Sequence, residues 1–149
     1  MKKKIIKWIL VVLWMGLIFY LSSRDRDEST NQSRSVVNQT KIVEIYEQKS
    51  NVDSETALED VDRVFRKTSH AVVYLVLAIL LCIALSEYNL SIKSILLISF
   101  IVCFIYSCTD EAHQLFVRGR SGEIRDIIID SIGSMIGIVL FYLYRRRKS

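Results

Sequence analysis

The side chains of this 149-residue chain that could do acid–base chemistry occur in three short clusters. The first cluster holds Lys67, His70 and Tyr74, whose spacing of three and four residues places them on one face of a helix. A histidine in such a place could act as a general acid or base. Lys67, by contrast, could simply be a snorkelling lysine at a helix end, and His70 could be a packed, hydrogen-bonded core residue.

The second cluster is the block Asp110-Glu111-Ala112-His113-Gln114. Asp110, His113 and Gln114 share a helical face by the same arithmetic. His113 or His70 could be the general acid or base of an enzyme, with Asp110 or Glu111 orienting it. The alternative is that both carboxylates are solvated loop residues.

Charged residues also occupy the connection that follows and the start of the next apolar stretch. Arg118 and Arg120 could bind an anionic group such as a phosphate, or contact lipid headgroups. Asp126 and Asp130 lie four residues apart, and an unpaired carboxylate at membrane depth should become neutral or find a cation. We therefore expect at least one close cation–carboxylate pair in this region. The residues considered for it are Lys67, Arg120, Asp126 and Asp130.

Metal-binding and nucleophile motifs are missing from the sequence. No HExxH or comparable spacing of ligands is present, so we expect no metal and no cofactor. Cys82, Cys103 and Cys108 are odd in number and have no CxxC spacing, which favours a role as small packing residues over disulfides or zinc ligands. No serine or cysteine stands beside a histidine in a recognisable nucleophile motif.

Four long apolar stretches must position these clusters. They cover about residues 5–21, 69–86, 92–109 and 127–144. Each is long enough, as a helix, to cross most of a bilayer, and together they would leave too little polar surface for a soluble protein. The prediction is an all-α polytopic membrane protein, a single domain over residues 1–149 built as a four-transmembrane-helix bundle. A soluble domain, a disordered chain and a secreted disulfide scaffold are excluded.

The distribution of charge predicts the topology. Both ends of the chain are strongly basic, whereas segments 22–68 and 110–126 have a slight acidic excess. Since Lys and Arg accumulate on the cytoplasmic side, both termini should be cytoplasmic and both segments outside. The net charge of +4 therefore reflects topology and headgroup contacts rather than nucleic-acid binding. A cleaved signal peptide is disfavoured, because the first apolar run is long and ends in Tyr20 and Leu21.

The outer segment 22–68 should contain an additional amphipathic helix, marked by Val36, Val37, Val43 and Tyr46. Thr56-x-x-Glu59 is typical of a capping box and predicts the start of a further helix. No Gly or Pro interrupts that helix before the second apolar stretch, so we expect the second membrane helix to begin well outside the bilayer.

Three of the four membrane helices should form the core of the site. The second, third and fourth each carry a polar face at the same outer depth, and burying these faces together satisfies their hydrogen bonds away from lipid. We expect the first helix to be peripheral, because apart from Lys7 at its start residues 5–21 contain no charged side chain. His70, Asp110, His113 and Asp126 should lie within one side-chain layer.

Gly133 and Gly137 follow Asp126 and Asp130 on the same helical stripe. Glycines four residues apart let another helix approach closely. They could serve packing within the chain, or a homo-oligomer.

These motifs in this order resemble the VanZ-like family of small bacterial membrane proteins. The resemblance rests on Lys67-x-x-His70-x-x-x-Tyr74, Asp110-Glu111-x-His113-Gln114, Gly119-Arg120, and Asp126 followed by Gly133-x-x-x-Gly137. There are two departures: Arg118 stands where the family usually has Pro, and Asp130 where it usually has Asn. The resemblance implies a multi-pass protein of the bacterial cytoplasmic membrane.

The founding member of the VanZ-like family is associated with low-level teicoplanin resistance, and no catalytic activity is established for the family. The resemblance therefore implies an envelope protein that contributes to glycopeptide or lipoglycopeptide resistance, with membrane lipids, a lipid-linked cell-wall component or a lipoglycopeptide as partners. The alternative is a membrane-embedded hydrolase or transferase acting on a lipid-linked envelope substrate. Tyr74, Gln114, Arg118, Arg120, Asp126, Asp130 and Lys67 would then bind the substrate, and His70, Asp110, Glu111 and His113 would be catalytic.

Overall fold

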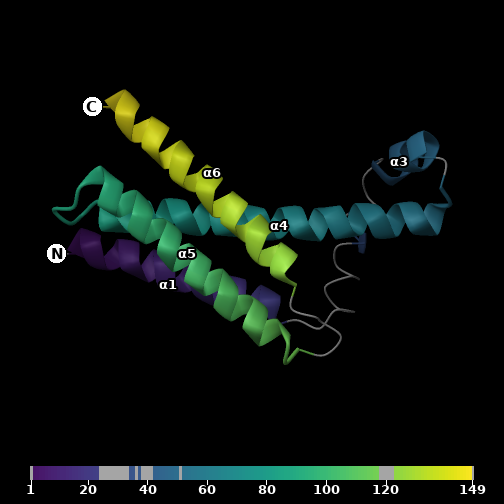
Figure 1. The fold of residues 1–149 in the computed structure, drawn as a ribbon, viewed down its shortest axis with the longest axis horizontal. Helices are drawn as coiled ribbons and strands as arrows, with labels where there is room; N and C mark the ends of the chain where they lie inside the picture. The colour runs from purple at the N-terminus through teal and green to yellow at the C-terminus, as the bar shows by residue number, and fades with distance from the viewer. Residues whose placement is uncertain are drawn as a thin grey trace.

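The computed structural model describes residues 2–23, 34–35, 37, 42–50, 52–117 and 123–148. Within these ranges the regular structure is entirely helical (Figure 1). The helices are α1 (Lys2–Ser22), α3 (Ile42–Ser50), α4 (Ser54–Leu85), α5 (Ile92–Gln114) and α6 (Ile124–Lys148). The helical outcome is expected, because a chain in hydrocarbon must satisfy its backbone hydrogen bonds within each segment.

Four of these helices, α1, α4, α5 and α6, are long and apolar enough to cross a membrane. Large apolar side chains such as Leu13, Leu97 and Val139 are exposed on their outer surfaces, as expected where lipid rather than water surrounds a protein. The prediction of an all-α, four-helix membrane bundle is confirmed.

Both termini lie at the same end of the bundle (Figure 1). We call this the termini end; it includes the start of α1, the turn between α4 and α5, and the last turn of α6. The opposite end, where α1 and α5 finish and α6 begins, is called the site end. The polar clusters found in the sequence lie toward the site end.

Helix α4 is much longer than a bilayer crossing requires. Its 32 residues span about 48 Å, and its first turns extend past the other helices toward α3 (Figure 1). The expected early start of this helix is confirmed. The additional helix in segment 22–68 is also present as α3, although Val36 lies outside the described residues. Helix α3 packs on the extension, where the Tyr46 hydroxyl donates to Asp60 at 3.3 Å.

The predicted capping box at Thr56 is wrong. The N-cap of α4 is Asp53, whose carboxylate accepts from the Thr56 backbone N–H at 3.1 Å and from its hydroxyl at 2.7 Å. Asp is as good an N-cap as Thr and stands three residues earlier, so the helix gains one more turn. The two bonds from Thr56 hold the pKa of Asp53 below its usual value.

Helix α6 crosses α4 at very short range through two glycines. A Cβ on Gly133 would collide with the backbone of Ala71 and lie 2.9 Å from its Cα. A Cβ on Gly137 would meet Leu75 in the same way, at 3.2 Å from its Cα. The glycine stripe therefore serves a contact within the chain. A homo-oligomer through Gly133 and Gly137 stays a prediction.

Helix α1 is attached to the bundle by polar contacts along its length. At the termini end the Lys7 ammonium pairs with Glu87 in the turn between α4 and α5. In the middle, the Trp14 indole N–H donates to the Val73 carbonyl at 2.9 Å. At the next residue, the Tyr106 hydroxyl of α5 donates to the Met15 carbonyl at 2.6 Å. These bonds fix both the rotation and the depth of α1.

The crossing of α4 and α6 predicts unequal costs for two similar substitutions. Gly133→Ala should destabilise the protein by roughly 1–3 kcal/mol or more, because the added methyl group has only backbone to displace. Gly16→Ala is the matched control: nothing lies within 4 Å of its Cβ, and alanine favours the helix. Thermal unfolding in detergent should show a lowered Tm for Gly133→Ala alone. Equal Tm values for the two variants would contradict this packing.

Candidate functional site

The centre of the candidate site is a polar contact among α4, α5 and α6. Asp130 of α6 is completely buried, and its Oδ2 accepts a hydrogen bond from the Ser107 hydroxyl of α5 at 2.9 Å. Tyr74 of α4 is also completely buried, beside Ser107. Asp110, one turn along α5 from Ser107, is buried as well. Three helices thus meet at one polar layer.

Two atoms of this layer have unused hydrogen-bonding capacity. The Tyr74 hydroxyl and Asp130 Oδ1 are buried and make no hydrogen bond of ordinary geometry, although Tyr74 lies close enough to Ser107 for a weak interaction. Leaving a polar group buried without a full partner costs about 1–3 kcal/mol. A donor and an acceptor kept at this cost are suited to receive a further polar group.

At the mouth of the site an ion pair joins α4 to α6. Lys67 Nζ lies 3.0 Å from Asp126 Oδ1 and 3.5 Å from Glu123 Oε2. The expected cation–carboxylate pair is therefore confirmed. Lys67 is not merely snorkelling, since it neutralises the carboxylates at the start of α6. His70 follows on the same helix between Lys67 and Tyr74 and is half-buried.

Glu111 holds the connection between α5 and α6 in place. Its Oε1 accepts from the Gln114 side-chain amide at 3.0 Å, and its Oε2 accepts from the Glu123 backbone N–H at 2.9 Å. Glu111 and Gln114 are both buried. The carboxylate thus satisfies an N–H at the start of α6, a place that favours negative charge. Neither Asp110 nor Glu111 is a solvated loop residue.

His113 is half-buried and turns toward α1. Its ring stacks on Phe19 with centroids 4.5 Å apart, and its Nε2 lies 3.2 Å from Ser23 Oγ. The end of α1 therefore covers one side of the site, whereas the polar layer itself is formed by α4, α5 and α6. The end of α1 carried no ionisable residue to reveal this contact.

Some predicted residues are not placed by the structure. Arg118 and Arg120 lie outside the described residues. Asp126 is half-buried beside Lys67, and Asp110 is buried in the polar layer. That His70, Asp110 and Asp126 fall within one side-chain layer stays a prediction.

The sequence analysis missed Ser107, which links the polar faces of α5 and α6. A signal was present: Ser99, Cys103 and Ser107 recur every four residues on α5, and all three are buried. Such a stripe of small residues is typical of a close helix contact in membranes. The stripe predicts where α5 packs, although not which carboxylate Ser107 reaches.

The described part of the chain contains no group of three His, Cys, Asp or Glu side chains that could hold a metal ion. All three cysteines are free thiols, and Cys82 and Cys103 are buried among apolar side chains.

Comparison with known proteins gives one result. A family model described as VanZ/LLP1 matches residues 7–145, which is nearly the whole chain. No curated protein and no solved structure gives a match.

The ion pair at the mouth of the site predicts a measurable coupling between α4 and α6. Lys67→Gln should destabilise the protein more than Asp126→Asn, because Lys67 also contacts Glu123. In a double-mutant cycle the coupling should be roughly 1 kcal/mol, at the upper end for half-exposed pairs. Thermal unfolding in detergent measures it, and Lys93→Gln is a control on an exposed lysine at the termini end. Strict additivity of the two single substitutions would argue against the pair.

Proposed function

This chain belongs to the VanZ/LLP1 family, and we propose that it contributes to teicoplanin-type resistance by binding a polar group of an envelope molecule. In this proposal it is a multi-pass protein of the bacterial cytoplasmic membrane, with both termini in the cytoplasm and the site end outside. The ligand is a lipid-linked cell-wall component or a membrane-anchored lipoglycopeptide. Binding takes place where α4, α5 and α6 meet.

The observation that carries the proposal is the unused hydrogen-bonding capacity of Tyr74 and Asp130. A purely structural network would be expected to pair these atoms, since each buried unpaired group lowers stability. A polar group of a ligand that reached this layer could accept from the tyrosine hydroxyl and donate to the carboxylate.

The charges of the described residues favour particular ligand groups. Asp110 and Asp130 are acceptors in the polar layer, whereas Lys67 is occupied by Asp126 and Glu123. Such a layer suits hydroxyl and amine groups, which the sugars and peptides of cell-wall precursors and glycopeptides carry. We assign the recognition of an anionic group such as a phosphate to Arg118 and Arg120, in the connection between α5 and α6.

A second candidate function is a hydrolase or transferase acting on a lipid-linked envelope substrate. The contact that favours it is the 3.2 Å distance between His113 Nε2 and Ser23 Oγ, which sequence spacing did not suggest. His113 would be the general base and Ser23 the nucleophile, although the Ser23 hydroxyl here donates to the Phe19 carbonyl at 2.6 Å and would have to turn toward the histidine. The arrangement is incomplete as a catalytic triad, because Asp110 faces the polar layer and both oxygens of Glu111 accept other hydrogen bonds. We therefore favour binding.

The proposed orientation can be tested by cysteine labelling of intact cells. Ser50→Cys, at the end of α3, should react with a membrane-impermeant maleimide from outside. Asn89→Cys, in the turn at the termini end, is the matched control and should react only after permeabilisation. Labelling of Asn89→Cys but not Ser50→Cys in intact cells would place the site on the cytoplasmic face and refute this function.

The role of the polar layer can be tested by the teicoplanin susceptibility of a host that expresses the chain. Tyr74→Phe removes only the buried hydroxyl, and losing one ligand hydrogen bond weakens binding by roughly tenfold. We expect Tyr74→Phe and Asp110→Asn to return the teicoplanin susceptibility toward that of a host without the chain. The amount of each variant in the membrane should equal that of the unchanged protein. Tyr142→Phe, the same change at a partly exposed position near the termini end, should have no effect.

The same assay separates the two candidate functions. The enzyme requires Ser23, so Ser23→Ala and His113→Ala would abolish the phenotype, whereas binding in the polar layer tolerates Ser23→Ala. Full resistance with both Tyr74→Phe and Asp110→Asn would contradict a binding role for the layer.

A further inference from the structure

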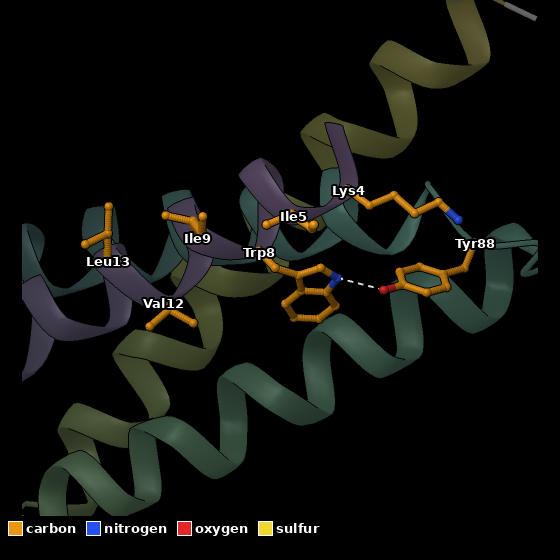
Figure 2. A pocket seen from close by; sticks show the side chains of 7 residues that line it. All are labelled: Lys4, Ile5, Trp8, Ile9, Val12, Leu13 and Tyr88. Carbon is orange, nitrogen blue, oxygen red and sulfur yellow. Dashed lines mark hydrogen bonds between the residues drawn. The ribbon is translucent and has the colours of Figure 1, made fainter. Parts of the chain in front are cut away.

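A groove lies on the surface of α1 near the termini end, far along the helix from the polar layer. It encloses about 400 Å³. Its wall is the apolar surface formed by Ile5, Ile9, Val12 and Leu13, and its polar end is formed by Lys4, Trp8 and Tyr88 (Figure 2). This volume is within the usual range of pockets that bind small molecules.

The wall of the groove faces lipid rather than protein. Val12 and Leu13 are each 64% exposed, on a helix long and apolar enough to cross the membrane. In a bilayer, acyl chains cover such side chains. A concave surface along this helix therefore fits one acyl chain lying parallel to α1.

The polar end of the groove offers two hydrogen-bond donors. The Trp8 indole N–H donates to the Tyr88 oxygen at 3.0 Å, so the Tyr88 hydroxyl keeps its own proton for another acceptor (Figure 2). The Lys4 ammonium lies 4.8 Å from the centroid of the Tyr88 ring, a cation–π contact that leaves its N–H groups free of a hydrogen bond to the ring oxygen.

Lys4, and not Lys7, is the cation available to a ligand. Lys7 forms an ion pair with Glu87. The hydrogen bond and charge of Lys7 hold the pKa of Glu87 below its usual value. Lys4 therefore adds positive charge beside a pair that is already neutral overall.

We propose that this groove binds an anionic phospholipid, with one acyl chain along Ile5, Ile9, Val12 and Leu13 and the phosphate held by Lys4 and Tyr88. A basic residue beside an anionic membrane surface attracts its lipids, and here the attraction is combined with a shaped apolar surface. The site is at the opposite end of the bundle from the polar layer and does not depend on the proposed function.

Trp8 lines the groove and can report its occupant directly. We consider the full chain with Trp14→Phe, so that Trp8 is its one tryptophan, reconstituted in vesicles that contain brominated phosphatidylglycerol or brominated phosphatidylcholine. Bromine on an acyl chain quenches a tryptophan that it contacts. Quenching of Trp8 fluorescence is measured as the mole fraction of the brominated lipid is increased. The two curves give the ratio of the association constants of the two lipids at Trp8. We expect phosphatidylglycerol to be preferred roughly fivefold, the ratio that about 1 kcal/mol per lysine produces.

Variants of Lys4 and of a matched lysine distinguish specific binding in the groove from attraction by the net positive charge of the protein. Lys4→Gln should bring the ratio near one, and Lys4→Arg should keep it. Lys148→Gln is the control, because Lys148 lies over the Tyr144 ring at 5.0 Å in the same kind of pair but does not line the groove. It should leave the ratio unchanged. Tyr88→Phe should lower the ratio in part.

Three results would overturn the proposal. The first is a ratio near one in the chain with Lys4 intact. The second is an equal loss in Lys148→Gln and Lys4→Gln, which would mean attraction by net charge alone. The third is Trp8 emission that changes with the protein-to-lipid ratio and is quenched equally weakly by both lipids, which would place a second copy of the chain in the groove.

Discussion

The close crossing of α6 over α4 is the contact on which the rest of the structure depends. Gly133 and Gly137 allow the two backbones to meet at Ala71 and Leu75, and in hydrocarbon such van der Waals contact is a main source of helix association. The crossing brings Asp130 into the interior, where Ser107 can reach it, and brings Asp126 to Lys67. A larger side chain at either glycine would separate the helices and expose both carboxylates to lipid.

A membrane interior makes each buried charge expensive, and the structure meets this cost in different ways at different depths. At the mouth of the site, Lys67 neutralises the start of α6. Gln114 serves Glu111 at the same end, and one layer deeper the neutral Ser107 hydroxyl serves Asp130. The incomplete pairing of Tyr74 and Asp130 stands out against this pattern. For this reason we regard that layer, rather than the more conspicuous histidines, as the place of recognition.

Helix α1 has two roles in this arrangement. Bonds from Trp14 and to Met15 attach it to α4 and α5, so its end covers His113 at one side of the site. Its opposite surface stays exposed to lipid and carries the groove near Lys4. Helix α1 thus packs on the bundle with one face, and its other face is exposed to lipid and carries the groove. The charged residues of α1 all lie near its start, so the sequence predicted no role for its other end in the site.

The sequence by itself determined the four membrane helices, the extension of α4 and the family. Length, apolarity and helical spacing are local properties, and they place Lys67, His70 and Tyr74 on one face of α4 without knowledge of contacts. The N-cap of α4 also depends on local sequence. It was predicted at Thr56 rather than at Asp53, because both are good capping residues and they stand three positions apart. Only the tertiary structure decided that the glycines face α4, that Ser107 reaches Asp130, and that His113 turns toward Phe19. Those outcomes depend on the rotation and crossing of whole helices, which interlocking side chains set together and no single periodicity encodes.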